Sequence, residues 1–222
     1  MGVPATLGQR RMTALTRSPL ERLLATCNGD LRGVRDRALL LFAWASGGRR
    51  RSEVAEARME HLERAGETGY IYRLAHSKTD QSGRGAASEP GKPIMGVAAA
   101  ALTAWLDASG VREGPIFRRV ARGKVTEPLS AQAIYRMVKQ RAKVAGLDGE
   151  FGAHSLRSGF VTEAGNQLVP LGEVMQLTGH KNVATALRYY QTGAVGQSKA
   201  ANLLGAGPAR EESASGDPAV PL

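Results

Sequence analysis

Residues 179–190 read GHKNVATALRYY, and the interpretation of the rest of the chain depends on this stretch. A glycine–histidine pair begins it, helical sequence follows over residues 182–190, and two adjacent tyrosines end it. Tyr189 lies nine residues beyond His180. An aromatic pair near the end of a helix more often belongs to a core than to a reactive site, so the meaning of this spacing depends on which polar motifs accompany it.

Three other polar stretches lie far from this one along the chain. HSLR occupies residues 154–157, and its His154 and Arg157 are three residues apart, which places both on one face of a helix. GGRRRSEV occupies residues 47–54, and SKTD occupies residues 77–80, where a strand is expected to run into a loop. The four stretches therefore combine arginine, lysine, histidine and tyrosine, which are residue types suited to chemistry on a phosphate.

In this order and spacing, the motifs resemble those of the tyrosine recombinase (phage integrase) family. The family pattern is an Arg followed three residues later by an acidic residue, a Lys in a turn between strands, His-x-x-Arg, and a Gly-His pair with a nucleophilic Tyr nine residues beyond its His. Each motif alone is weak, but together they are highly specific, and the match spans roughly residues 20–204. The matching residues are Arg50, Glu53, Lys78, His154, Arg157, His180 and Tyr189.

The residue types also suit the attack of a tyrosine on a phosphodiester. Such a reaction gathers negative charge on the non-bridging oxygens, and arginine donates paired hydrogen bonds to such oxygens while it stays charged. Arg50 and Arg157 are therefore expected to stabilise the transition state. Tyr189 is expected to attack phosphorus, and because a free phenol has a pKa of about 10, it needs cationic surroundings or a base.

The resemblance gives the remaining side chains their expected roles. Lys78, on a turn, is expected to protonate the leaving alkoxide as general acid. His154 is assigned to proton handling with Tyr189, and His180 to a hydrogen bond with the phosphate. Glu53 is expected to support the site by orienting it instead of reacting.

The resemblance also implies the course of the reaction and its partners. Cleavage would leave a 3′-phosphotyrosyl link to double-stranded DNA and a free 5′-hydroxyl, and a hydroxyl from another strand would rejoin the DNA without ATP. Recombination would use a homotetramer on two DNA sites, with a C-terminal segment, here around residues 197–204, packed on a neighbour. We expect no cofactor and no metal, because no cluster of carboxylates in the sequence suggests Mg²⁺.

For two of the assigned site residues, the arginine of the first motif and the general-acid lysine, the sequence offers alternatives. The run of arginines at 49–51 could be a solvated basic run, and the spacing to Glu53 selects Arg50 from it, so Arg49 and Arg51 are expected to bind the DNA backbone or lie on the surface. Relatives commonly carry an apolar residue at the position of Arg49. Lys92, on the next expected strand, competes with Lys78 for the role of general acid.

The expected fold class is mainly α with a small antiparallel β-sheet, the tyrosine recombinase catalytic domain fold. Ser18 is predicted to cap the first helix, with Pro19 at its first position and Glu21 returning a bond to the cap, and this helix should end near Cys27. An apolar stripe is predicted to be core at Ala131, Ile134, Tyr135 and Val138. Further helices are expected at 31–45, 51–57, 97–109, 130–145, 153–163, 171–177, 182–190 and 197–204, and strands at 70–76 and 92–95.

The expected domain organisation is an N-terminal arm or linker at 1–17, the catalytic domain at 18–204 and a disordered C-terminal tail at 205–222. Lys and Arg number 30 against 20 Asp and Glu, and the formal net charge of +10 favours binding to nucleic acid. Cys27 is the single cysteine, so a disulfide framework is excluded and a reducing, cytoplasmic compartment is favoured. Because no apolar run is long enough to cross a bilayer, membrane attachment is not expected.

Three functions remain open on the sequence alone. Family members usually carry a separate helical domain ahead of the catalytic one, and only the short stretch 1–17 precedes the expected domain here. The chain is therefore expected to be an active strand-transfer enzyme or, alternatively, a truncated DNA-binding remnant or accessory factor that lacks recombination activity. A topoisomerase-like enzyme that nicks and closes DNA is the third possibility. In the family, the helical domain and the catalytic domain form a clamp around DNA. With the catalytic domain alone, affinity for DNA should rest on phosphate contacts and fall steeply with salt.

Overall fold

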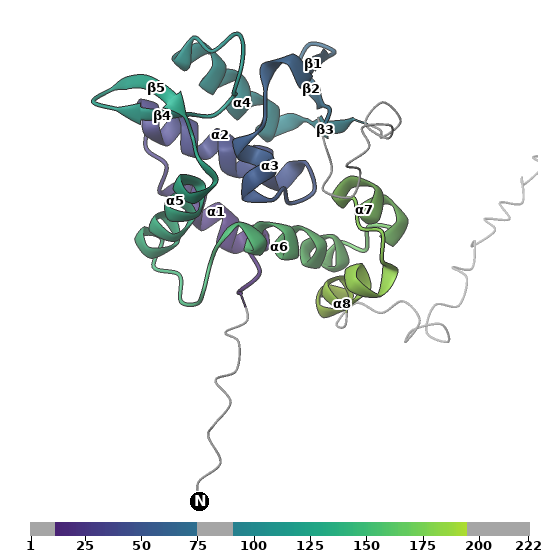
Figure 1. Cartoon of the computed structure of the whole chain (residues 1–222). Coiled ribbons are helices and arrows are strands. Elements are labelled where there is room, and N and C mark those ends of the chain that lie inside the picture. The colour runs from purple at the N-terminus through teal and green to yellow at the C-terminus, as the bar shows by residue number, and fades with distance from the viewer. Residues whose placement is uncertain (1–11, 75–90, 195–222) are drawn as a thin grey trace, which may run out of the picture.

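The computed structural model describes residues 12–74 and 91–194 of this chain, and shows mostly helices with two small antiparallel sheets (Figure 1). The helices are α1 (Arg17–Ala25), α2 (Leu31–Ala45), α3 (Arg51–Ala55), α4 (Gly96–Ser109), α5 (Ala131–Val144), α6 (Ala153–Asn166), α7 (Leu171–Thr178) and α8 (Val183–Ala194), with a 3₁₀ turn at Met59–His61. The strands are β1 (Leu62–Ala65), β2 (Gly69–Tyr72), β3 (Lys92–Ile94), β4 (Arg118–Ala121) and β5 (Lys124–Pro128). The predicted fold class is confirmed.

The strands form a three-stranded sheet in the order β1-β2-β3 and a separate β4-β5 hairpin. The predicted pairing of the strand after Gly69 with the strand at Lys92 is present, with Tyr72 opposite Lys92 in the β2–β3 register. The sequence did not predict β1 or the hairpin. Arg122 and Gly123, at the hairpin turn, both have positive φ, as a two-residue turn between antiparallel strands requires.

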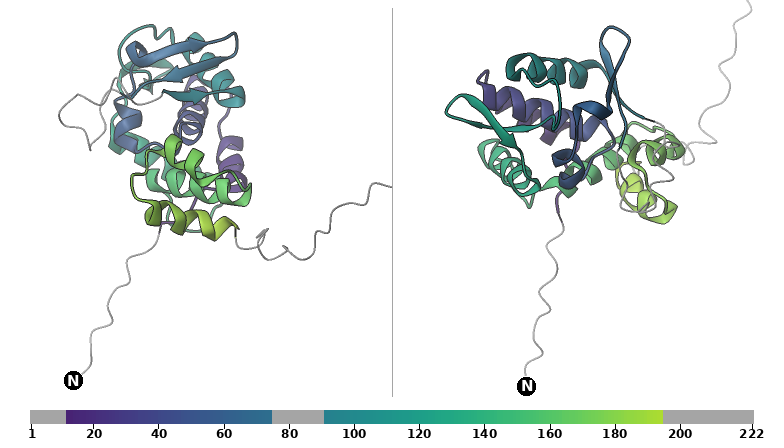
Figure 2. Two further views of the ribbon diagram at one scale, coloured as in Figure 1. Left: turned by 90° about the vertical axis from the view of Figure 1, so that its right-hand side faces the viewer. Right: turned by 45° about the horizontal axis from the view of Figure 1, so that its top comes forward.

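Helix α2 contributes many buried residues to the main core and contacts both α4 and α6. The ring of Phe42 meets the rings of Tyr72 and Phe117 edge to face, with centroid distances of 5.1 and 5.4 Å. Phe42 of α2 therefore packs against both strand β2 and the residue just before strand β4. A second, smaller cluster of Val161, Ala164 and Val174 lies between α6, α7 and α8. Figure 2 shows α6, α7 and α8 gathered on the side of the molecule away from the three-stranded sheet. The C-terminal helices therefore form their own packed unit, built on α6.

The start of α1 differs from the prediction. The helix begins at Arg17 with Thr16 as its N-cap, and the Thr16 side chain makes no capping hydrogen bond, so the proposed capping by Ser18 is wrong. The backbone N–H of Arg17 instead donates to Glu163 Oε2 of α6 at 3.1 Å, and the Glu21 carboxylate accepts from Arg17 Nε at 2.8 Å. A carboxylate from a distant helix has taken the place of the local cap, because anions at a helix N-terminus satisfy the free amides equally well.

Residues 12–16, the described end of the predicted arm, pack against the domain. Leu15 is fully buried, its N–H donates to Ser155 O at 2.8 Å, and its carbonyl accepts from Trp44 Nε1 at 3.2 Å. A Cβ on Gly159 would lie 1.9 Å from the same carbonyl, so this segment rests directly on α6. Residues 1–11, the predicted helix at 197–204 and the predicted tail at 205–222 lie outside the described residues.

Helix α5 begins as predicted, with the Ser130 hydroxyl accepting from Ala133 N at 3.2 Å. Of its predicted apolar stripe, Ile134 and Val138 are buried, whereas Ala131 and Tyr135 are only half-buried and were wrongly expected to be core. Over residues 12–74 and 91–194, none of the helices is long and apolar enough to span a bilayer.

Candidate active site

The turn between α2 and α3 brings the arginine run to α6 and α7. Gly47 and Gly48 have φ of 92° and 69°, a region that favours glycine. A Cβ at Gly47 would lie 2.6 Å from Leu177 O, and one at Gly48 would lie 2.2 Å from the Cα of Arg157. The absence of side chains at both positions therefore allows this turn to contact the backbone of two helices at once.

Glu53 holds Arg50 at the start of α3. Its Oε2 accepts from Arg50 N and its Oε1 from Arg50 Nη1, both at 3.0 Å. The Arg50 side chain is 54% exposed and that of Glu53 is 16% exposed, so the guanidinium is fixed at one edge and open to solvent at the other. The supporting role of Glu53 in the reaction stays a prediction.

Arg157 lies one turn beyond His154 on α6 and is almost completely buried. Its Nη2 donates to Thr178 O, the last carbonyl of α7, at 2.6 Å. Burial, then the neighbouring charges of Arg49 and Arg50, lower its pKa to about 10, a value at which the guanidinium is still charged at neutral pH. Because arginine has five donors, this bond leaves others available for an anion.

His154 faces Tyr189 across α6 and α8. Its Nε2 lies 3.4 Å from the Tyr189 hydroxyl, and the two rings are roughly perpendicular with centroids 6.2 Å apart. Burial, followed by the charges of Arg157 and Arg50, lowers the pKa of His154, so the imidazole is held in the neutral form that can accept a proton. The distance is long for a hydrogen bond, but it leaves the two groups within reach of each other.

The docking of α8 on α6 determines where Tyr189 points. The Tyr190 hydroxyl donates to Val169 O at 2.7 Å, and the Thr162 hydroxyl donates to Tyr189 O at 3.2 Å. A Cβ on Gly165 would lie 2.1 Å from Tyr190 O, so the two helices touch backbone to backbone. Both Tyr189 and Tyr190 pack against the small C-terminal cluster, and the Tyr189 hydroxyl is directed toward His154.

His180 follows the left-handed Gly179 that ends α7. Its Nδ1 lies 2.7 Å from the Thr178 hydroxyl. Burial, then the charges of Arg157, Arg50, Arg49 and His154, lower its pKa to about 4, so the ring is neutral at physiological pH. When the Thr178 hydroxyl donates to Nδ1, the ring proton lies on Nε2 and is available to a phosphate oxygen.

Arg49 does not lie on the surface, and the prediction that it binds the DNA backbone or solvent is wrong. It is 3% exposed, and its Nη2 donates to Leu177 O of α7 at 2.8 Å. The two glycines before it turn the chain so that this side chain points inward, toward helix carbonyls that need donors. Arg51 is exposed, as expected, and lies over the ring of Tyr135 at 5.5 Å.

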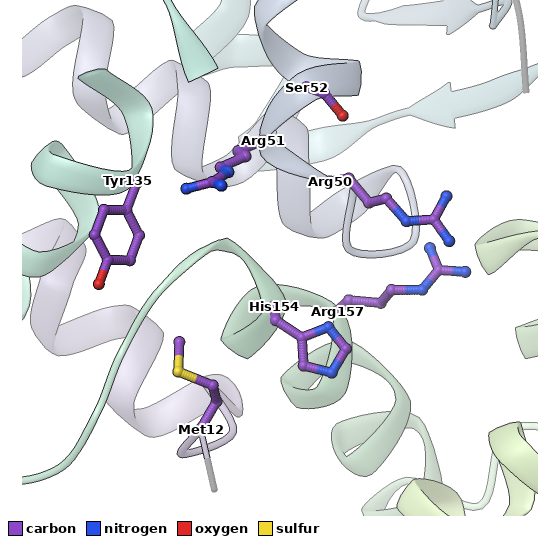
Figure 3. Close-up of a pocket in the computed structure, with 7 residues that line it drawn as sticks. All are labelled: Met12, Arg50, Arg51, Ser52, Tyr135, His154 and Arg157. Carbon is purple, nitrogen blue, oxygen red and sulfur yellow. The ribbon is translucent and has the colours of Figure 1, made fainter. Parts of the chain in front are cut away.

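A pocket of about 400 Å³ opens beside these side chains. Figure 3 shows Arg50 and Arg157 directed to the same side of it, with His154 close by. None of the residues that line it is acidic, so the pocket favours an anion. Sequence reasoning missed Met12 and Tyr135, which belong to no motif, and it gave no role to Ser52 of the GGRRRSEV stretch. Tyr135 had been taken for core. The lining residues are Met12, Arg50, Arg51, Ser52, Tyr135, His154 and Arg157.

The two candidate lysines differ in what the structure describes. Lys78 lies outside the described residues, and its role stays a prediction. Lys92, its competitor, is 3% exposed and its Nζ donates to Gln176 O of α7 at 2.8 Å. Across residues 12–74 and 91–194, no three His, Cys, Asp or Glu side chains gather in a way that could hold a metal ion.

The chain is similar to known recombinases in sequence. It matches the model of the phage integrase family over residues 13–194. An integrase/recombinase XerD homolog of Selenomonas ruminantium is 36% identical in a match 179 residues long, which covers 78% of this chain and 52% of that protein. Tyrosine recombinase XerC of Xylella fastidiosa (strain M23) is 30% identical over 157 residues, which are 71% of this chain and 48% of that protein. The chain thus spans about half the length of these relatives.

The fold is similar to that of solved recombinases. The XerH site-specific recombinase bound to a palindromic difH substrate, a post-cleavage complex, aligns with a TM-score of 0.62 at 18% identity over 87% of this chain and 54% of that one. A dimer of lambda integrase (75–356) bound to a COC′ core site aligns with a TM-score of 0.61 at 18% identity over 85% and 62%. With a family model that covers most of its length and a fold shared with these enzymes, the chain belongs to the phage integrase family.

Proposed function

We propose that this chain is the catalytic part of a site-specific tyrosine recombinase, which cleaves and rejoins double-stranded DNA through Tyr189. The single observation that carries the proposal is the hydroxyl of Tyr189, 3.4 Å from His154 Nε2, next to a pocket lined by Arg50 and Arg157. A nucleophile, a neutral base and two guanidinium groups lie together on three different elements. This combination is what attack on a phosphodiester needs.

In the proposed reaction, His154 Nε2 takes the phenolic proton as the Tyr189 oxygen attacks phosphorus. The bond from phosphorus to the 5′-oxygen breaks, and a 3′-phosphotyrosyl link forms. Arg50, Arg157 and the neutral His180 bind the non-bridging oxygens as negative charge develops there. The 5′-oxygen leaves with a proton, which we assign to Lys78.

Rejoining is the reverse of cleavage. A 5′-hydroxyl attacks the phosphotyrosyl phosphorus, its proton passes to the general acid, and the Tyr189 oxygen regains its proton from His154. Because the link conserves the bond energy, no ATP is needed, and because guanidinium groups supply the positive charge, the proposed mechanism uses no metal or other cofactor.

The proposed partners are double-stranded DNA and other copies of this chain. The net charge of +10 favours DNA, and a similar structure of lambda integrase (residues 75–356) is described as bound to DNA. We propose a homotetramer on two DNA sites during recombination, acting in the cytoplasm, with residues 18–204 as the catalytic domain.

One observation favours an alternative. The chain spans only about half the length of its relatives, so these residues by themselves would act as a DNA-binding remnant or accessory factor if cleavage needed more than the part of the relatives that they match. A topoisomerase-like activity would use the same tyrosine and would give no exchange of partners.

Covalent trapping tests the proposal. The chain is incubated with a pool of nicked duplexes of random core sequence, in which the cleaved end diffuses away, and the products are run on a denaturing gel. We expect a DNA-linked band from the wild type and from Tyr190→Phe, the matched control, and none from Tyr189→Phe. DNA binding without any covalent band would refute the proposal in favour of the accessory factor. Relaxation of a supercoiled plasmid without recombinants would indicate the topoisomerase-like activity.

A further inference from the structure

Three successive backbone carbonyls at the C-terminal end of α7 each accept a hydrogen bond from a different buried cation. The cations come from three parts of the chain: the turn before α3, strand β3 and helix α6. We call these three cations the α7 cap. The pairs are Lys92 Nζ with Gln176 O at 2.8 Å, Arg49 Nη2 with Leu177 O at 2.8 Å, and Arg157 Nη2 with Thr178 O at 2.6 Å.

The hydrogen bonds of the α7 cap supply acceptors to three buried cations and donors to the last carbonyls of α7. The last carbonyls of a helix lack intrahelical partners and carry the negative end of the helix dipole. The three cations are only 3–7% exposed, and burial of a charge is tolerated when it is paired and hydrogen-bonded. Cationic donors at the C-terminal carbonyls therefore stabilise this end of α7 in one position.

The end of α7 is connected directly to the proposed active site. Gly179 and His180 follow the capped carbonyls without any intervening residue, and the third member of the cap is Arg157 itself. The position of α7 thus determines where His180 lies and how the Arg157 guanidinium is held. Cations on these carbonyls also offset the negative end of a helix that would otherwise repel a phosphate at the site.

Arg49 and Lys92 are the members of the α7 cap that match no motif position, and Arg49 is the one next to the motif arginine. Its neighbour Arg50 takes the position of the motif arginine. The Gly47–Gly48 turn, which contacts the backbone of Leu177 and Arg157, brings Arg49 to the helix end. Arg49 Nη1 also lies 3.7 Å from Glu53 Oε2. Glu53 is the carboxylate that orients Arg50, so Arg49 links this carboxylate with the end of α7.

We infer that Arg49 is a positioning residue for strand cleavage: together with Lys92 it fixes the C-terminal end of α7, and thereby His180 and the Arg157 guanidinium. The inference rests on the proposed function for its effect on cleavage, but its effect on His180 is independent of that function. The charge of Arg49 also contributes to the lowered pKa of both His180 and Arg157.

The test compares variants of the full chain. Arg49→Met keeps the length of the side chain but removes its charge and donors, and Arg49→Lys restores a charged donor. The matched control is Arg37→Met, because Arg37 Nη2 donates to Leu24 O at the end of α1 at 2.8 Å, a helix end that contributes nothing to the pocket. The measurements are the single-turnover rate of covalent complex formation at saturating DNA, the Kd for DNA, and the thermal unfolding midpoint.

We expect Arg49→Met to lower the cleavage rate roughly ten- to a hundredfold, since small displacements of a reacting group reduce rates by about this factor. The Kd for DNA should change much less than the rate. Arg49→Lys should recover most of the rate, and Arg37→Met should lose stability without a comparable loss of rate. Equal rates in wild type and Arg49→Met, or equal losses of rate in Arg49→Met and Arg37→Met, would overturn the inference. Should Arg49→Met fail to fold, Arg49→Gln, which keeps one donor for Leu177 O, is judged by the same criteria.

A measurement on the free protein separates this inference from the proposed function. The imidazole NMR signals of His180 are titrated in each variant without DNA. In Arg49→Met, we expect the His180 signals to shift and the pKa to rise, because a nearby positive charge and a fixed position are lost, whereas Arg37→Met should leave both unchanged. If His180 responds but the wild type forms no covalent complex, the proposed function fails and the positioning role stands. If His180 does not respond, the positioning role fails whatever the activity.

Discussion

Because α6 and α8 are in close backbone contact, we expect one added methyl group at Gly165 to reduce both the stability of the protein and its cleavage rate. Gly165 lies in α6 where α8 crosses it, and a Cβ added there would meet Tyr190 O at 2.1 Å. Side-chain Cβ atoms essentially never approach a neighbour closer than 3.0 Å, so Gly165→Ala must separate the two backbones by about an ångström. Because both atoms belong to helices, side-chain rotation cannot relieve the overlap.

The magnitude follows from what α8 carries. Ala favours a helix over Gly by about 0.5–1 kcal/mol, but overpacking of this kind destabilises by about 1–3 kcal/mol, so a net loss of stability is expected. Tyr189 is next to the displaced carbonyl, and its hydroxyl is already 3.4 Å from His154 Nε2. A shift of an ångström would place the pair beyond hydrogen-bond reach, and the cleavage rate should fall about a hundredfold.

The assay measures urea unfolding and the rate of covalent complex formation for matched variants. Gly159→Ala is the control, because a Cβ there meets Leu15 O at 1.9 Å and disturbs the other side of the same helix. Gly172→Ala, with no atom within 4 Å of the added Cβ, reports the intrinsic effect of alanine. We expect Gly159→Ala to lose stability with a much smaller loss of rate. A Gly165→Ala variant that cleaves at the wild-type rate would refute the view that backbone contact with α6 positions Tyr189.

Two further predictions concern the charged groups. The folded-state pKa of His180, about 4, is below that of an unfolded His at about 6.5, so the stability this group contributes is fully present above about pH 6.5 and is lost as the pH falls toward 4. The free energy of unfolding of His180→Gln, followed from pH 7 to 4.5, should fall less steeply than that of the wild type, and parallel curves would contradict the burial argument. Asp36→Asn should cost about 3–5 kcal/mol, because the buried Asp36 carboxylate accepts hydrogen bonds from both Arg35 and Arg141, and its loss leaves two guanidinium groups without their counter-ion. Chemical denaturation measures this loss, and a change below about 1 kcal/mol would show that the network is solvated.

Much of the secondary structure follows from local sequence. Helices α2, α5 and α7 lie within a residue or so of their predicted bounds, because each combines apolar periodicity with a clear end, such as the Ser130 cap or Gly179. Strand β1 and the β4-β5 hairpin were missed, because they are short and largely exposed and so lack an apolar alternation. The cap at Ser18 was wrong because Glu163, remote in the chain, satisfies that helix start.

The sequence by itself determined the family, since that depends on the order and spacing of Arg50, His154, His180 and Tyr189, which need no coordinates to be recognised. Only the tertiary structure decided what the residues between those motifs do. Arg49 is buried at the end of α7 because two glycines allow the backbone to approach Leu177, a contact between residues 128 positions apart. Such contacts depend on how whole helices pack, and one-dimensional patterns of hydrophobicity carry no information about which distant carbonyl a side chain will meet.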